Sequence, residues 1–259
     1  MKNFYNKYSL NKHLLESAGS TVDPVILTKL MTLLKHEDTN YVIQGIQLAQ
    51  FYMSEDEIID KVFHENGWKK DGANWILLEE FPTNRFFTNI TYLSFWNSDL
   101  TSLPDSIVKL KNLTELDLSQ NKLTSLPDWI GNMTNLNEIW LYGNQLTSLP
   151  DSIGNLTKLT ELYLSGNQLR SLPDSIGNLT NITELDLSSN RLTSLPDSIG
   201  NLTNLTKLDL ERNYLKFLPD SIGNLTNLKN LNVANNHSIT LSSNIRNLMR
   251  NGTKIIQFV

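Results

Sequence analysis

The sequence predicts an α/β fold: a right-handed solenoid of stacked repeats whose short strands form one parallel sheet. The first observation is periodicity, because a 23-residue segment beginning at Leu113 returns with few changes at Leu136, Leu159, Ile182 and Leu205. The second is that leucines alternate with polar residues at the start of each copy, the pattern of a strand with one buried face. The third is a further set of apolar residues in the second half of each copy. One such unit leaves its apolar side open, so only stacked neighbours can cover it.

Residues 1–66 precede the repeats and predict a helical N-terminal cap. Asp23-Pro24 is typical of a helix start, and apolar residues follow it at helical spacing. A second helix is predicted over residues 40–53, and Ser54 with Glu57 forms a capping box for a third. Terminal repeats need a cover for their open core, which favours a cap. An independent docking domain is the alternative.

Residues 67–89, interrupted by Lys70-Asp71-Gly72, predict a hairpin that connects this region to the first repeat. Residues 90–250 hold about seven repeats, and residues 251–259 predict a C-terminal capping strand. Each repeat contains an asparagine where the chain leaves the strand, and its amide can satisfy the backbone of the adjacent loop. This column is Asn121, Asn144, Asn167, Asn190, Asn213 and Asn236.

A Leu-Pro-Asp segment opens the second half of each repeat. Proline fixes φ and donates no hydrogen bond, so we expect it on the side away from the sheet. The aspartate is expected to accept from the amides of a short helical turn, and a glycine such as Gly131 to end that turn.

These repeats resemble the 23-residue leucine-rich repeats of the form L-x-x-L-x-L-x-x-N-x-L followed by L-P-x-x-I-x-x-L. Such repeats occur in many bacterial proteins and in the Ras-group family of eukaryotic scaffolds, and the match covers about 160 of the 259 residues. The resemblance implies a leucine-rich-repeat solenoid, a curved horseshoe with a parallel sheet on its concave side. It also implies a protein-binding role for that concave face.

Composition narrows the class of protein. The chain has no cysteine, its formal net charge is −5, and it shows neither a secretion signal nor a stretch able to span a membrane. We therefore expect a cytoplasmic protein that binds neither nucleic acid nor membrane, since nucleic-acid binding favours a basic stripe. That it is bacterial is what the repeat resemblance implies. A secreted protein whose signal lies upstream of this sequence is the alternative.

No residue pattern predicts chemistry. The four histidines are scattered without metal-ligand spacing, and no nucleophile elbow, phosphate loop or zinc signature occurs. We therefore expect no enzyme activity, no catalytic residue, no metal site and no cofactor.

The polar positions of the strands form three columns on the concave face, and the positions that differ between repeats are available to a ligand. One column holds four glutamates on neighbouring strands, a like-charge ladder that a cationic ligand would relieve. Duplication of one ancestral repeat explains the ladder without any ligand. The candidate partner-binding residues are Tyr92, Trp96, Glu115, Glu138, Trp140, Tyr142, Glu161, Tyr163, Glu184 and Asp186.

The aromatic members of this set are the more informative ones. Trp140, Tyr142 and Tyr163 occupy positions filled elsewhere by aspartate or serine, and aromatic residues are favoured interface anchors. Packing of the rings against each other along the sheet is the competing explanation. Trp129 replaces a serine on the convex side, where it is either a second contact or a cover for the adjacent helical turn.

The sequence therefore predicts a noncatalytic interaction module or scaffold that binds a protein or peptide, plausibly basic, through an acidic and aromatic concave face. A secreted or surface-associated bacterial adhesin of the virulence type is one alternative. A regulator of a small GTPase is another, suggested by the Ras-group resemblance alone. The oligomeric state is not specified by the sequence, and a monomer is the default.

Overall fold

The computed structural model describes residues 91–103, 105–237, 239–250 and 252–257. The helical cap expected at residues 1–66 and the hairpin connector expected at residues 67–89 lie outside the described residues.

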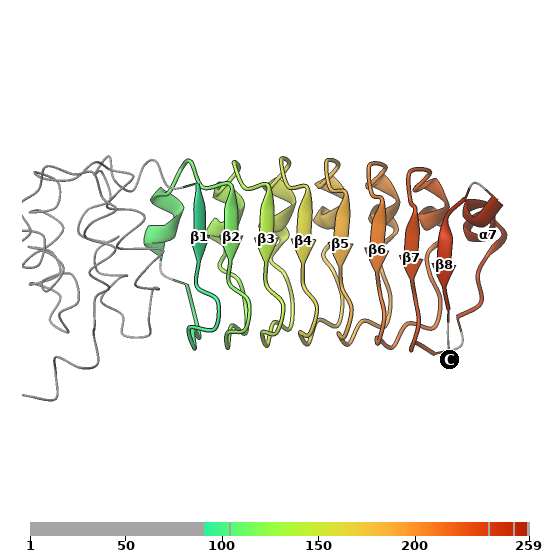
Figure 1. Cartoon of the computed structure of the whole chain (residues 1–259), viewed down its shortest axis with the longest axis horizontal. Coiled ribbons are helices and arrows are strands. Elements are labelled where there is room, and N and C mark those ends of the chain that lie inside the picture. Colours follow the sequence, from blue (N-terminus) through green and yellow to red (C-terminus); the bar gives the residue numbers. More distant parts are fainter. Residues whose placement is uncertain (1–90, 104, 238, 251, 258–259) are drawn as a thin grey trace, which may run out of the picture. The chain divides into compact units, whose positions relative to one another are not determined.

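The described strands form a single parallel sheet in which each strand pairs with the next one along the chain (Figure 1). This arrangement confirms the predicted solenoid, because every 23-residue step returns the chain to the same sheet one strand further on. We number the rungs by their strands. The strands are β1 (Tyr92–Ser94), β2 (Glu115–Asp117), β3 (Glu138–Trp140), β4 (Glu161–Tyr163), β5 (Glu184–Asp186), β6 (Lys207–Asp209), β7 (Asn230–Asn232) and β8 (Lys254–Ile256).

Short 3-10 helices follow the strands on the opposite side of the solenoid (Figure 1). Each begins directly after the proline of the Leu-Pro-Asp segment, as expected from the fixed φ of proline. Their bounds are η2 (Asp105–Lys109), η3 (Asp128–Asn132), η4 (Asp151–Asn155), η5 (Asp174–Asn178), η6 (Asp197–Asn201) and η7 (Asp220–Asn224).

The core lies between the sheet and these helices. Each inner strand buries its central apolar residue, such as Leu162, and the leucine that follows the strand, such as Leu164. The returning half of the same rung adds Leu169, Leu172 and Ile176, all buried. Full burial of one such side chain stabilises the fold by about 1.5–3 kcal/mol.

The asparagine ladder joins neighbouring rungs. The Asn167 side chain donates from Nδ2 to the carbonyl oxygens of Leu141 at 2.9 Å and Leu164 at 3.0 Å. Its Oδ1 accepts from the Leu146 amide at 3.0 Å. Each asparagine therefore satisfies backbone groups of its own rung and of the preceding one, as the sequence predicted.

Two expectations about the helical turn are wrong. Pro127, not Asp128, occupies the N-cap of η3, and no side chain caps this helix. Gly131 lies inside η3 instead of ending it, and a Cβ placed there would collide with the backbone carbonyl of Ser152 in the next rung. The glycine is needed because adjacent turns approach too closely for a side chain, not because it terminates the helix.

The C-terminal rung departs from the others. The α-helix α7 (Ser243–Arg250) takes the place of a 3-10 helix and buries Ile245 and Leu248. Strand β8 then pairs with β7 within the segment for which the sequence predicts a closing strand. The Thr253 hydroxyl donates to the Leu228 carbonyl at 2.6 Å, which ties the end of the chain to rung 7.

Candidate functional site

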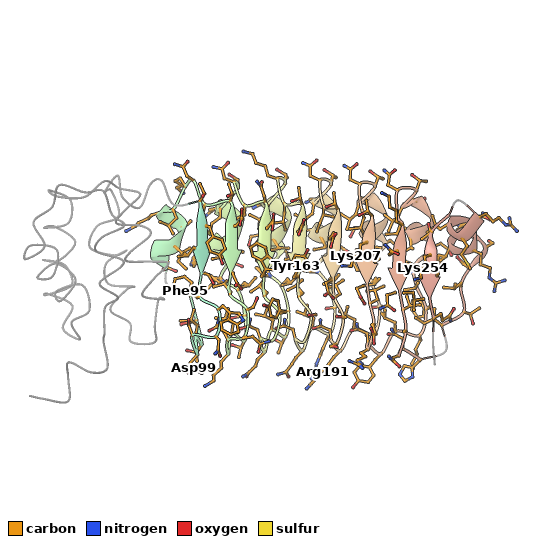
Figure 2. The ribbon with its side chains drawn as sticks, in the orientation of Figure 1. Phe95, Asp99, Tyr163, Arg191, Lys207 and Lys254 are labelled. Atoms are coloured by element: carbon orange, nitrogen blue, oxygen red, sulfur yellow. The ribbon has the colours of Figure 1, made fainter. Side chains whose placement is uncertain are left out.

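The solvent-facing side of the sheet, called the sheet face below, carries the polar residues of the strands. Parallel register places equivalent residues side by side, for example Glu138 beside Glu161 and Trp140 beside Tyr163. The predicted columns are thus continuous in space, and Figure 2 shows Tyr163 and Lys207 on them. Seven of the predicted residues lie in strands β2 to β5 of this face: Glu115, Glu138, Trp140, Glu161, Tyr163, Glu184 and Asp186.

Four glutamates on strands β2 to β5 form an uninterrupted ladder of like charge. Desolvation by burial raises the pKa of Glu138, and repulsion from Glu161 and Glu115 raises it further. The ladder ends at rung 6, where Lys207 Nζ lies 3.2 Å from Glu184 Oε2. The glutamates before that ion pair face solvent on one side and each other along the sheet, an arrangement that favours a cation.

The rings of Trp140 and Tyr163 stack on the sheet face. Their centroids are 6.3 Å apart and their planes differ by 2°. Both side chains are half-buried, so the stack shields part of each ring and leaves the rest accessible. The competing explanation from the sequence therefore describes a real contact, which does not exclude a partner from the remaining surface.

The Tyr163 hydroxyl connects this stack to the glutamate ladder. It donates to Glu161 Oε2 at 2.6 Å and approaches Glu184 Oε2 at 3.4 Å. Burial, the hydrogen bond to Glu161 and the nearby negative charges raise the pKa of Tyr163 well above its ordinary value. The hydroxyl therefore stays protonated and holds the Glu161 carboxylate beside the rings.

In the other rungs, the residue equivalent to Trp140 and Tyr163 has a backbone role that the sequence analysis missed. Asp186 Oδ1 accepts a hydrogen bond from the Ser188 amide at 2.9 Å, two residues further on. The same bond, from the equivalent amide, is made by Ser94, Asp117, Asp209 and Asn232. These short polar side chains stabilise the turn that ends each strand.

The residue after that amide adopts a positive φ in every rung from 1 to 7. Where the polar side chain is present, the position is occupied by residues other than glycine, such as Gln120 (57°) and Ser189 (52°). In the two aromatic rungs it is Gly143 or Gly166, each with φ of 68°. Glycine removes the cost of this conformation in the rungs that have lost the side-chain hydrogen bond.

This exchange leaves two backbone donors open beside the stacked rings. The amides of Tyr142 and Ser165 correspond to those bonded by aspartate elsewhere, and neither has a hydrogen-bond partner among the described residues. Rungs 3 and 4 therefore combine apolar ring surface, carboxylates and free amide donors. The paired spacing of an aromatic residue and a glycine three positions later is visible in the sequence and could have indicated this.

The remaining predicted residues lie at or near the first rungs. Tyr92 in β1 and Trp96 just beyond it are exposed, Trp96 by 55%. Tyr142 follows β3 and is half-buried. Ser119 of rung 2 occupies the position equivalent to Trp96 and Tyr142. The alternation along the strand predicts that it faces solvent, but it is fully buried. The aromatic residues thus form two groups separated by rung 2.

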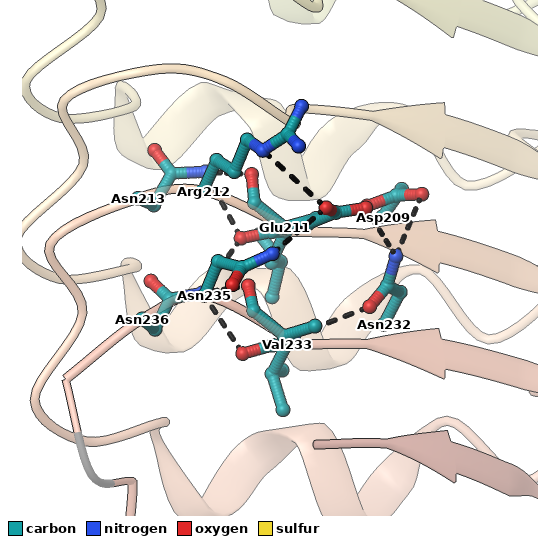
Figure 3. A network of polar contacts seen from close by, with 10 residues as sticks. Asp209, Glu211, Arg212, Asn213, Asn232, Val233, Asn235 and Asn236 are labelled. Atoms are coloured by element: carbon teal, nitrogen blue, oxygen red, sulfur yellow. Dashed lines mark hydrogen bonds and ion pairs between the residues drawn. The ribbon is translucent and has the colours of Figure 1, made fainter. Parts of the chain in front are cut away.

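Rungs 6 and 7 carry a polar network that is satisfied within the protein (Figure 3). Asn232 donates to Asp209 Oδ2 and to Glu211 Oε2, each at 3.2 Å. Asn235 donates to Glu211 Oε1 at 3.0 Å, and Arg212 lies 3.6 Å from the same oxygen. Burial raises the pKa of Asp209, partly offset by the hydrogen bonds that Asp209 accepts from the Glu211 amide and the Asn232 side chain. The carboxylates of this end have side-chain partners, whereas those of Glu115 and Glu138 in the ladder have no hydrogen-bond or ion-pair partner among the described residues.

Trp129 on the helical side contacts its neighbouring rung. Its indole Nε1 donates to Asp105 Oδ1 at 2.6 Å, so the ring covers the adjacent turn η2. This contact favours the covering role among the two interpretations of Trp129.

Within the described residues, no group of three or more histidine, cysteine, aspartate or glutamate side chains is placed to hold a metal ion. In the same part of the chain, no helix has the length and apolar character needed to cross a bilayer.

Comparison with known proteins gives one family. A family described as "Leucine-rich repeat region" matches residues 87–168 and 162–250. No curated protein matches the chain. A solved leucine-rich repeat protein of Leptospira interrogans is 37% identical, with a TM-score of 0.63 over 68% of this chain and 45% of that one.

Two plant receptors are also similar. The peptide hormone receptor RGFR1, in complex with RGF2, is 34% identical with a TM-score of 0.59, covering 66% of this chain and 28% of the receptor. The ectodomain of the Arabidopsis thaliana receptor kinase GASSHO1/SCHENGEN3, in complex with CASPARIAN STRIP INTEGRITY FACTOR 2, is 27% identical with a TM-score of 0.56, covering 66% and 24%. The chain spans less than half the length of each of these three structures.

Proposed function

The chain belongs to the leucine-rich repeat proteins, and we propose that it is a noncatalytic module that binds a protein or peptide on its sheet face. Members of this family are generally binding modules without catalytic activity. Two of the similar structures are receptors in complex with a ligand, which supports a protein or peptide partner as a class.

The observation that carries the proposal is the exchange in rungs 3 and 4. Replacement of aspartate by Trp140 and Tyr163 removes the hydrogen bond that ends the strand in the other rungs. The fold compensates with Gly143 and Gly166 instead of restoring the bond. These aromatic side chains remove a hydrogen bond that stabilises the turn. Their presence is therefore better explained by binding than by stability.

The chemistry of these rungs favours a basic segment with exposed backbone carbonyls. A lysine or arginine of the partner would lie beside Glu138 and Glu161 and relieve their repulsion. It would also meet the accessible part of the Trp140 and Tyr163 rings, a geometry that suits cation–π contact. The open amides of Tyr142 and Ser165 would donate to carbonyl oxygens of the same segment.

The test is affinity capture with the full chain, with captured proteins identified by mass spectrometry and then titrated by calorimetry. The double change Trp140→Ala with Tyr163→Ala is expected to weaken partner binding by about 2 kcal/mol or more on the hot-spot scale. Charge reversal at Glu138 and Glu161 should act mainly on the association rate, with an effect that shrinks as salt rises. The matched control is Trp129→Ala, which removes an indole from the helical side of rung 2. Unchanged affinity in the aromatic double variant would show that the partner binds elsewhere.

A further inference from the structure

The loops that run from the asparagine ladder to the prolines form one edge of the solenoid, away from the sheet face. We call residues 168–171, 191–194 and 214–217, with His237, the loop edge. Backbone hydrogen bonds hold these loops in register: the Tyr214 amide donates to the Leu192 carbonyl at 2.9 Å, and the Arg191 amide to Leu169 at 2.9 Å. Equivalent residues of successive rungs therefore lie about 5 Å apart along this edge, and Figure 2 labels Arg191 on it.

Rung 6 departs from the other repeats along this edge. It carries Tyr214 where the two preceding repeats have glutamine or arginine, and Phe217 where they have serine. The Tyr214 side chain is 53% exposed and that of Phe217 is 59% exposed. The Tyr214 ring also meets the His237 ring, with centroids 6.1 Å apart and planes tilted by 43°. Neither aromatic side chain fills the core, so the fold does not require them.

The same edge is basic in rungs 4 to 6. Arg170, Arg191 and Lys216 are exposed, and none of these side chains forms a hydrogen bond or ion pair with the described residues. No aspartate or glutamate occurs between the asparagine and the proline of rungs 4 to 6. At the other end of the edge, Lys122 is paired with Asp99 at 3.1 Å. The unpaired basic charge is thus concentrated next to the exposed rings.

From this arrangement we infer that the loop edge is a second interaction surface, which binds an acidic segment of a partner protein that carries an apolar side chain. Arg170 and Arg191 present guanidinium groups suited to carboxylates, and Tyr214 and Phe217, in rung 6 with Lys216, offer an apolar anchor beside them. Rungs 4 to 6 span roughly 10 Å, the length of about three extended residues. A short acidic segment therefore matches the extent of the patch.

A nucleic acid is the less suitable polyanion. The molecule carries a net charge of −5, and its sheet face bears the glutamate ladder, so a long uniform polyanion is repelled by the protein as a whole. A short acidic peptide contacts the basic edge locally and avoids most of that repulsion. The loop edge is basic, whereas the sheet face of the proposed function is acidic. Binding at the loop edge does not depend on binding at the sheet face.

The repeats themselves supply variants expected to preserve the fold. The ring variant is Tyr214→Gln with Phe217→Ser, and the charge variant is Arg170→Thr, Arg191→Gln and Lys216→Thr. Each change installs the residue found at the equivalent position of another repeat. Thermal melting of each variant checks folding. If the ring variant does not fold, Arg191→Gln alone serves as the test, since that exposed side chain has no hydrogen bond or ion pair to lose among the described residues.

The probe is a fluorescein-labelled 12-residue peptide in which four glutamates flank a leucine–phenylalanine pair, read by fluorescence anisotropy. We expect the full chain to bind it, the ring variant to bind about 10-fold or more weakly, and the charge variant to lose both affinity and salt dependence. The Trp140→Ala, Tyr163→Ala variant should bind the probe as the wild type does.

Three results would overturn the inference. The first is equal binding of the probe by the wild type and the ring variant, and the second is equal binding of a peptide with lysine in place of glutamate. The third is that the wild type prefers a 12-nucleotide single-stranded DNA to the probe and that the ring variant loses this DNA binding. The last result would assign the edge to nucleic acid.

Discussion

One position of the repeat, the last residue of the strand, holds an aspartate in three rungs and an aromatic residue in two others. The aspartates are Asp117, Asp186 and Asp209, the aromatic residues are Trp140 and Tyr163, and the two kinds of residue make different contacts. Each aspartate accepts the backbone amide two residues later at 2.9 Å. The aromatic residues instead stack on each other and leave that amide open. At the scale of single residues, this position therefore either stabilises the turn through a side-chain hydrogen bond or leaves the turn without that bond.

Glu138 is predicted to make stability depend on pH. Its pKa is raised above the ordinary value of 4.5, so between these two values the folded chain binds more protons than the unfolded chain. The contribution of this group is therefore most favourable at low pH and is lost as pH rises through the raised pKa. Glu138→Gln should accordingly melt at a higher temperature than the wild type at pH 7. The gain should stay below about 1 kcal/mol, because the group is partly solvated.

The measurement is thermal melting of both proteins from pH 7 down to pH 4.5. The difference between them should narrow as pH falls and as salt is added. Asp174→Asn, an exposed carboxylate outside the ladder, is the control. A difference that widened toward pH 4.5 would show that ionised Glu138 is stabilised, not destabilised, in the folded chain.

Leu164 tests which side of the strand faces the core. Its side chain is fully buried between rungs, so Leu164→Ala should lower the free energy of unfolding by about 2–5 kcal/mol. Gln145→Ala, an exposed loop position, should change it by no more than about 0.5 kcal/mol. Both values come from denaturant titration, and similar losses at the two sites would contradict the buried position of Leu164.

At the scale of the element, each strand ends in a turn whose stability has two sources. One is the side-chain hydrogen bond from the residue that Asp186 represents, and the other is glycine at the positive-φ position. Rungs 1 to 7 use one or the other. The two sources therefore substitute for each other, and changing both residues in one rung should show it.

The prediction concerns rung 4, where Tyr163 and Gly166 can be exchanged for the aspartate and serine of rung 5. Gly166→Ser alone should destabilise the protein by about 1 kcal/mol, because φ is 68° and the turn lacks the side-chain hydrogen bond. In a Tyr163→Asp background the same change should cost much less, since aspartate restores the bond. A cycle of the four proteins by denaturant titration measures this coupling. Independent effects of the two changes would mean that glycine is not compensating for the lost aspartate.

The elements also show which parts of the fold the sequence could predict. The leucine and asparagine columns recur in every repeat, so a single register assigned Leu164 and Asn167 to the core and the ladder. The role of Gly131 was predicted wrongly because a glycine after an apolar residue is equally typical of a helix end and of a close approach between backbones. Only the position of Ser152 in the neighbouring rung separates the two. The stack of Trp140 on Tyr163 likewise depends on ring orientation, which repeat register does not determine.

At the scale of the molecule, the described solenoid has a continuous core but only neighbouring rungs in contact. Its two surfaces differ in charge. The sheet face carries glutamates and the stacked rings, whereas the loop edge carries unpaired basic residues with Tyr214 and Phe217. The two surfaces lie on different sides of the same solenoid. In both surfaces, the distinctive residues occur in only a few rungs and differ from the equivalent residues of the other repeats, while the core residues are nearly the same in all of them.

The equivalence of the rungs predicts that one whole repeat can be removed. Deletion of residues 182–204 takes out β5 and η6 and joins Asn181 to Leu205 in the original register. Glu161 would then lie beside Lys207, and Gly177 would face Ser221, a pairing equivalent to those already present. The shortened protein should keep the oligomeric state of the full chain and unfold cooperatively, at a lower temperature because one rung interface is lost. Deletion of residues 182–197 breaks the register and should expose core leucines, leading to aggregation. Light scattering with thermal melting distinguishes the two cases, and aggregation of both chains would show that the rungs are not interchangeable.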